Sequence, residues 1–122
     1  MMEGGHLLTA DIEPMTGRDD VAILKLIGEA DLATADQVRE AFRRLVELDV
    51  TTAVIDASGV EFIDSTGLHA LVDGERMLQE QGMSAVLVPS RIVKRVLDLV
   101  FPDGLFTTRV DTLEEALALI RG

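Results

Sequence analysis

The stretch VIDASGVEFIDSTGLHALV, residues 54–72, joins a run of apolar and β-branched residues to a second run in which the apolar residues have helical spacing. Between the two runs lie the four small or polar residues DSTG, numbers 64–67. Apolar, β-branched runs are typical of strands, whereas Asp, Ser and Thr are frequent at helix starts. The stretch therefore predicts a strand that stops at Ser58 and Gly59, then a junction, then a helix that Gly82 ends.

Patterns on both sides of this stretch predict further strands and helices. Two β-type runs, residues 7–12 and 21–27, flank the turn-forming series EPMTGRDD and predict an N-terminal hairpin. Two more strands are predicted over residues 85–88 and over FTTRV, residues 106–110. Apolar residues three and four positions apart predict three helices, each with one buried stripe. The stripe of the first helix includes Leu32, Ala35, Val38, Phe42, Leu45 and Val46. That of the second includes Leu68, Leu71 and Leu78, and that of the third includes Ile92, Val93, Val96, Leu97 and Val100.

A last helix is predicted from TLEEALALI, where Thr112 and Glu115 have the spacing of a capping box. Strands therefore alternate with helices after the opening hairpin. This order predicts an α/β fold with a mixed, mostly parallel sheet, one antiparallel pair from the hairpin, and about four helices. At 122 residues the chain has the size of one domain, 1–122, with a core over about residues 7–121.

The composition excludes several classes of function. Eleven basic residues against 22 acidic ones give a formal net charge of −11, which disfavours binding to nucleic acid or to an anionic membrane. The absence of cysteine excludes disulfides, thiol catalysis and cysteine-based metal sites. The start, MMEGGHLLTADIE, has no basic segment followed by an apolar core, and no run reaches membrane-spanning length. We expect a cytoplasmic protein that binds other proteins.

The DSTG junction is the candidate functional site. At a helix N-terminus several backbone NH groups lack helical partners, so Ser65 or Thr66 could serve as the N-cap, and Gly67 would let the backbone come close to whatever docks there. One cap is enough for one helix, and a spare exposed hydroxyl at such an end is suited to carry a phosphate. The alternative that stays open is structural: DSTG is only a good helix start.

A phosphate at this place would change binding more than folding. It adds about −1.5 to −2 charges beside Asp64. Its repulsion from one partner carboxylate at ~6 Å is on the order of 1 to 5 kcal/mol, and each ~1.4 kcal/mol is a factor of ten in affinity.

Three segments together resemble the STAS domains, and in particular the bacterial anti-sigma factor antagonists. They are GEADLATADQVREAF, then VIDASGVEFIDSTGLHALV, which carries the most specific part, and PSRIVKRVLDL. The resemblance covers about residues 21–119. It implies a small sheet flanked by helices, which agrees with the element order predicted from the patterns alone.

The resemblance also implies a switch and its residues. In this family the first serine of the D-S-[ST]-G motif is phosphorylated by an anti-sigma factor that is itself a serine kinase, and the unphosphorylated form binds that kinase so that the sigma factor is released. Carried over, Ser65 is the phosphoacceptor, Asp64, Thr66 and Gly67 shape its loop, and Asp31 contributes to the partner surface from the neighbouring loop. A PP2C-type serine phosphatase would reset the switch. No catalytic residue, cofactor or metal is implied, and free relatives of this kind are often monomers.

Two features depart from the family pattern. His69 stands where relatives often have glycine or another side chain, one turn beyond Ser65, so it could pair with a phosphate or a partner acid or simply face solvent. The segment 99–106 is longer than the usual passage out of the third helix. A basic cluster, Arg91, Lys94 and Arg95, could be a second partner contact or a phosphate site, but such residues are more often the solvent face of a helix, and this is the interpretation we adopt.

Other classes of function fit the sequence less well. A serine hydrolase lacks a G-x-S-x-G elbow, and its only histidines would be His6 and His69. A receiver domain would use Asp56, but no acidic pair follows the first strand. No phosphate-binding glycine motif is present. The alternative within the family is a STAS subunit or regulatory partner of a transporter or a stress-sensing complex.

Overall fold

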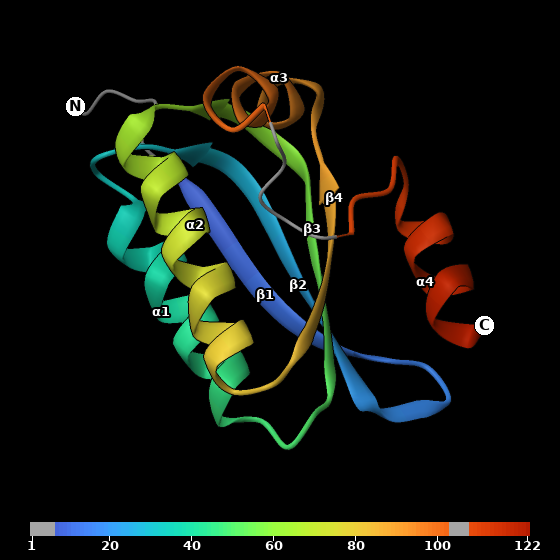
Figure 1. The fold of residues 1–122 in the computed structure, drawn as a ribbon. Coiled ribbons are helices and arrows are strands. Elements are labelled where there is room, and N and C mark those ends of the chain that lie inside the picture. Colours follow the sequence, from blue (N-terminus) through green and yellow to red (C-terminus); the bar gives the residue numbers. More distant parts are fainter. Residues whose placement is uncertain (1–6, 103–107) are drawn as a thin grey trace.

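A curved sheet separates two layers of helices in the computed structural model, which describes residues 7–102 and 108–122. Figure 1 shows α1 and α2 on one face of the sheet, α4 on the other, and α3 across one end. The elements are β1 (Leu8–Met15), β2 (Arg18–Ala30), α1 (Ala35–Glu47), β3 (Thr52–Ile63), α2 (Ser65–Glu80), β4 (Ser84–Pro89), α3 (Arg91–Val100) and α4 (Leu113–Arg121).

The strand order is β1-β2-β3-β4, with β1 antiparallel to β2 and the other neighbours parallel. The predicted fold class, with its hairpin and four helices, is confirmed. Parallel neighbours need crossover connections, and α1 and α2 provide two of them on the same face. Because all three parallel strands end at one edge, the loops that follow β2 and β3 lie next to each other there.

The hairpin turn is shorter than predicted. Strand β1 runs through Glu13 and Pro14 to Met15, and β2 starts at Arg18, so the turn consists of two residues rather than of EPMTGRDD. Pro14 fits because β1 is an edge strand, where a missing NH costs no hydrogen bond to a further neighbour. Gly17 takes a φ of 83°, which favours glycine.

Strand β3 continues past Ser58 and Gly59, where the sequence predicted its end. It pairs with β2 as far as Ala30 and Ile63, with register shifts on the way. At Gly59 a Cβ would lie 2.9 Å from Cγ1 of Ile27, so this glycine permits a close approach of two strands. The extended pairing carries the chain directly to the junction at residue 64.

The predicted fifth strand is reduced to a single bridge in the described part of the chain. Arg109 pairs with Leu87 of β4 in parallel, and the Leu87 NH donates to the Thr108 carbonyl at 3.0 Å. The first two residues of FTTRV lie outside the described residues. So do residues 103–106 of the longer segment predicted over 99–106, whose first two residues belong to α3.

Apolar side chains fill both sides of the sheet. Under α1 and α2 the core includes Leu24, Ile55 and Phe42, and under α4 it includes Val54 and Val88, all of them fully buried. Helices α1 and α2 pack closely: a Cβ on Gly74 would lie 2.2 Å from the Phe42 ring. Among the described residues, no helix has both the length and the apolar character needed to cross a membrane.

Candidate functional site

The junction between β3 and α2 is capped by Asp64. Its side chain accepts a hydrogen bond from the Gly67 NH at 2.9 Å, and its carbonyl accepts from the Leu68 NH at 2.9 Å. The expectation that Ser65 or Thr66 is the N-cap is therefore wrong. Asp, Ser and Thr cap helices almost equally well, and here the residue with extended backbone geometry is the aspartate. Ser65 becomes the first residue of the helix.

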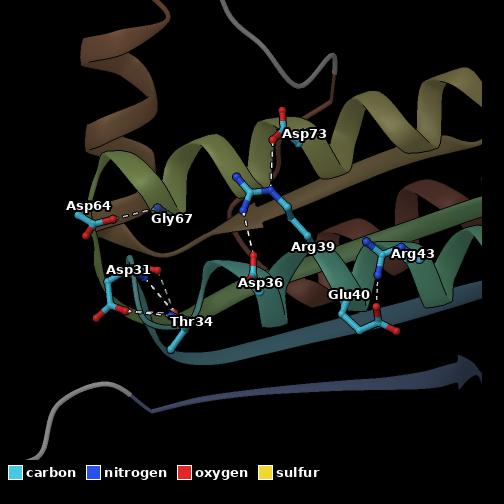
Figure 2. Close-up of polar contacts among 9 residues, drawn as sticks. All are labelled: Asp31, Thr34, Asp36, Arg39, Glu40, Arg43, Asp64, Gly67 and Asp73. Atoms are coloured by element: carbon cyan, nitrogen blue, oxygen red, sulfur yellow. Dashed lines mark hydrogen bonds and ion pairs between the residues drawn. The ribbon is translucent and has the colours of Figure 1, made fainter.

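Asp64 also ties the junction to the loop between β2 and α1. Its second carboxylate oxygen accepts from the Leu32 NH at 3.3 Å, and its own NH donates to the Ala30 carbonyl at 3.1 Å. Figure 2 shows Asp64 turned toward Gly67, with Asp31 and Thr34 of the neighbouring loop close by. The two loops are thus fixed relative to each other by one side chain and one backbone bond.

Gly67 serves this same contact. A Cβ at this position would lie 2.0 Å from the Ala30 carbonyl oxygen, so any side chain would push the first turn of α2 away from the end of β2. The residue is buried. The sequence predicted that Gly67 leaves room for a docked group, but the group that approaches it is the chain's own backbone.

Asp31 lies in the neighbouring loop, as expected, but the residue is only 3% exposed. Its carboxylate accepts from the NH groups of Ala33 at 3.0 Å and Thr34 at 3.2 Å. The Thr34 hydroxyl in turn donates to the Glu29 carbonyl at 2.7 Å and accepts from the Asp31 NH. The carboxylate therefore shapes the loop from inside.

Ser65 and His69 are exposed and Thr66 is half-buried. Within the described part of the chain, the Ser65 hydroxyl makes no hydrogen bond, and the NH groups of Ser65 and Thr66 have no acceptor. The first turn of α2 carries no acidic residue after Asp64. A free hydroxyl next to two free NH groups at a helix N-terminus is a place that can accept a phosphate.

Two apolar side chains near the junction were not identified from the sequence. Leu32, predicted inside the first helix, lies before α1 and is 76% exposed, and Phe62 at the end of β3 is 48% exposed. The bond from the Leu32 NH places that residue beside Asp64. Thr34 is the N-cap of α1, and a threonine directly before Ala35 is the signal that could have placed Leu32 outside the helix.

Ion pairs form within α1 and between α1 and α2 on the outer side of this helix layer. Arg39 pairs with Asp36 at 3.5 Å and with Asp73 at 3.3 Å, and Arg43 pairs with Glu40 (Figure 2). In the described residues, no group of three or more His, Asp or Glu side chains could hold a metal ion. The Ser65 junction, residues 64–67, is the candidate site, because it combines an exposed hydroxyl with free NH groups at a helix N-terminus.

Comparison with protein families and curated proteins gives a consistent result. A STAS domain model matches residues 14–117. The anti-sigma-F factor antagonist RsfB of Mycobacterium tuberculosis is 34% identical over 102 residues, which are 84% of this chain and 83% of RsfB. The STAS match includes the Ser65 junction, and the RsfB match covers most of the chain.

Solved structures include similar folds. An anti-sigma factor antagonist from Mycobacterium paratuberculosis superposes with a TM-score of 0.78 at 29% identity, over 99% of this chain and 100% of that one. The anti-sigma factor antagonist SpoIIAA in its unphosphorylated form gives a TM-score of 0.68 at 26% identity, over 93% of this chain and 99% of SpoIIAA. The likeness therefore includes the whole sheet and its helices.

Proposed function

The chain belongs to the STAS domain family, and we propose that it acts as an anti-sigma factor antagonist whose binding is switched by phosphorylation of Ser65. In the unphosphorylated form it binds an anti-sigma factor serine kinase, which then releases the sigma factor. A PP2C-type serine phosphatase restores the binding form. The names of the relatives support the antagonist function, and the modification and its enzymes are our proposal.

The observation that carries this proposal is the free Ser65 hydroxyl on a helix end that is already capped. Because Asp64 supplies the cap, a phosphate on Ser65 removes no hydrogen bond that holds α2 in place. The two free NH groups and the helix dipole favour the added charge by about 0.3 to 1 kcal/mol. The modification can therefore be made without unfolding the junction.

The proposed binding surface surrounds this hydroxyl. Exposed Leu32 and Phe62 supply apolar contacts, and His69, one turn beyond Ser65 on α2, supplies a polar contact on the same side. Asp31, Asp64, Thr66 and Gly67 contribute by fixing the shape of the two loops. A kinase that docks here would have the phosphoacceptor within its footprint, so one surface would serve both binding and modification.

The phosphate then acts by repulsion. Asp64 keeps a carboxylate beside Ser65, and the whole chain carries a net charge of −11. A phosphate on Ser65 therefore adds to existing negative charge, and a partner would need positive charge at this place to offset it. Repulsion from one partner carboxylate at ~6 Å is on the order of 1 to 5 kcal/mol. We therefore expect phosphorylation to weaken binding about tenfold or more.

The transporter and stress-complex alternative has weaker support. The relatives described above are named anti-sigma factor antagonists and are matched over most of their length. The intact D-S-T-G motif also fits partner switching. Cytoplasmic location remains part of the proposal.

Titration calorimetry against candidate anti-sigma factor kinases tests the switch. Ser65→Ala should bind like the wild type but resist modification, whereas Ser65→Asp should bind at least about tenfold more weakly. Ser84→Asp is the matched control. Ser84 is exposed at the other end of the sheet, and its replacement by Asp adds the same charge as Ser65→Asp. Equal weakening by both Asp variants would mean that net charge, and not the Ser65 junction, governs binding.

A further inference from the structure

The basic residues of the chain fall into two groups. All eleven lie in the described residues. Six form ion pairs there, namely Arg18, Lys25, Arg39, Arg43, Arg76 and Arg109. Arg44 instead donates to the Ala10 carbonyl. Those with neither kind of contact in the described chain are Arg121 at the end of α4 and three neighbours on α3, Arg91, Lys94 and Arg95.

This concentration on α3 is unexpected for a chain with twice as many acidic as basic residues. Asp98 lies one turn beyond Lys94, where it could form an intrahelical pair, yet it pairs with Arg109 at 3.1 Å. Arg91, Lys94 and Arg95 are exposed on one side of the helix, opposite the buried Val93. The outer side of α3 is therefore a positive surface on an otherwise acidic molecule.

Apolar surface adjoins these cations. A surface pocket of about 330 Å³ lies between α3 and the end of β3, and it is lined by Val60, Glu61, Ser90, Arg91, Ile92 and Arg95. Half-buried Ile92 contributes apolar surface over the buried Val60, and the charges at the pocket are those of the two arginines and of exposed Glu61. Leu99, two turns beyond Ile92 on the same side of α3, is 74% exposed. Figure 1 shows α3 across the end of the sheet, on the opposite side of β4 from α4.

We propose that the α3 face, defined as Arg91, Ile92, Lys94, Arg95 and Leu99 with their pocket, is a docking surface for an acidic, partly apolar segment of a partner protein. Free cations beside exposed apolar groups match a segment in which acidic and apolar residues alternate on one face. Nucleic acid is a poorer match, because its dense negative charge would be repelled by the remaining surface. This surface does not depend on the function proposed for Ser65.

Nuclear magnetic resonance with the isotope-labelled full chain tests the proposal. The probe is a short synthetic peptide with Glu and Leu at helical spacing, and the control probe carries Lys in place of Glu. The Glu peptide should shift the amide signals of residues 60–61 and 90–100, and the shifts should weaken with added salt. The Lys peptide should leave these signals in place.

Matched variants separate local from net charge. Arg91→Gln, Lys94→Gln and Arg95→Gln together should weaken Glu-peptide binding at least about fivefold, since three exposed charge contacts are lost. Gln is a good helix former, so α3 should stay folded. Arg43→Gln, Arg76→Gln and Arg121→Gln together give the same net charge on other faces and should retain the affinity within about twofold. Ser65→Asp should also retain it, whatever its effect on a kinase.

Several results would overturn this assignment. Equal weakening by the two triple variants would show a response to net charge alone. Displacement of the Glu peptide by inorganic phosphate at equal concentration would show a small-anion site. Tighter binding of single-stranded DNA than of the Glu peptide would show a nucleic-acid site.

Discussion

Asp64 makes three contacts that define the candidate site at the scale of single residues. It caps α2, accepts from the Leu32 NH of the neighbouring loop, and donates its own NH to Ala30. Each contact alone is ordinary. Together they leave the next residue, Ser65, without a structural task and with an exposed hydroxyl.

Replacement of Asp64 should separate its capping role from its charge. Asp64→Ala should lower the free energy of unfolding by about 1 to 2 kcal/mol, because the Gly67 NH loses its acceptor. Asp64→Asn should stay close to wild type, since Asn caps as well as Asp. Urea denaturation measures both values. An alanine variant as stable as the asparagine variant would contradict the capping role.

Arg18 and Asp20 form an ion pair that depends on pH. The Arg18 guanidinium donates to both Asp20 carboxylate oxygens, at 2.9 and 3.0 Å, and these hydrogen bonds hold the pKa of Asp20 below its ordinary value. A lowered folded-state pKa stabilises the fold above the unfolded pKa, and this contribution is lost as the pH falls through the folded pKa. Arg18→Gln should raise the pKa of Asp20 toward its ordinary value, as followed by carbon-detected titration. An unchanged pKa would exclude Arg18 as the cause.

At the scale of elements, α1 and α2 act as one layer that sets where the two functional loops lie. The helices approach closely because Gly74 has no side chain at the place where the Phe42 ring packs. Arg39 adds an ion pair from α1 to Asp73 of α2 (Figure 2). Since each helix begins just after one of the loops, a change in helix packing should move the loops.

A double-mutant cycle tests this packing. Gly74→Ala gains up to about 1 kcal/mol in helix propensity, but its Cβ would lie 2.2 Å from the Phe42 ring, and overpacking costs about 1 to 3 kcal/mol. We expect net destabilisation. In a Phe42→Leu background the same substitution should cost less, with a coupling of at least about 0.5 kcal/mol. Thermal unfolding measures all four proteins, and strictly additive effects would contradict the contact.

Much of the fold could be predicted because the apolar spacing that forms each helix is local. What failed depended on contacts between distant residues. In the sequence, Gly59 resembles the end of a strand, but in the structure it lies against Ile27 of the neighbouring strand. Asp64, Ser65 and Thr66 are equal candidates for the N-cap in the sequence, and only the backbone geometry selects Asp64. The burial of Asp31 likewise depends on how its loop closes over Thr34.

At the scale of the whole molecule, the fold carries two candidate surfaces at the same end of the sheet. The Ser65 junction lies where β3 passes into α2, and the α3 face lies across the end of the sheet (Figure 1). Two features of the edge strand β1 disfavour its pairing with a strand of another molecule. The Arg44 guanidinium donates to the Ala10 carbonyl, and Pro14 has no NH to donate. We therefore propose a monomer in the free state.

Mapping the phosphate by mass spectrometry decides whether Ser65 is the modified residue. The purified protein is incubated with ATP and candidate anti-sigma factor kinases, and the modified residue is identified in the wild type and in Ser65→Ala. We expect phosphate on Ser65 in the wild type and none in the variant. Phosphate on Thr66 alone, or none with every candidate kinase, would contradict it.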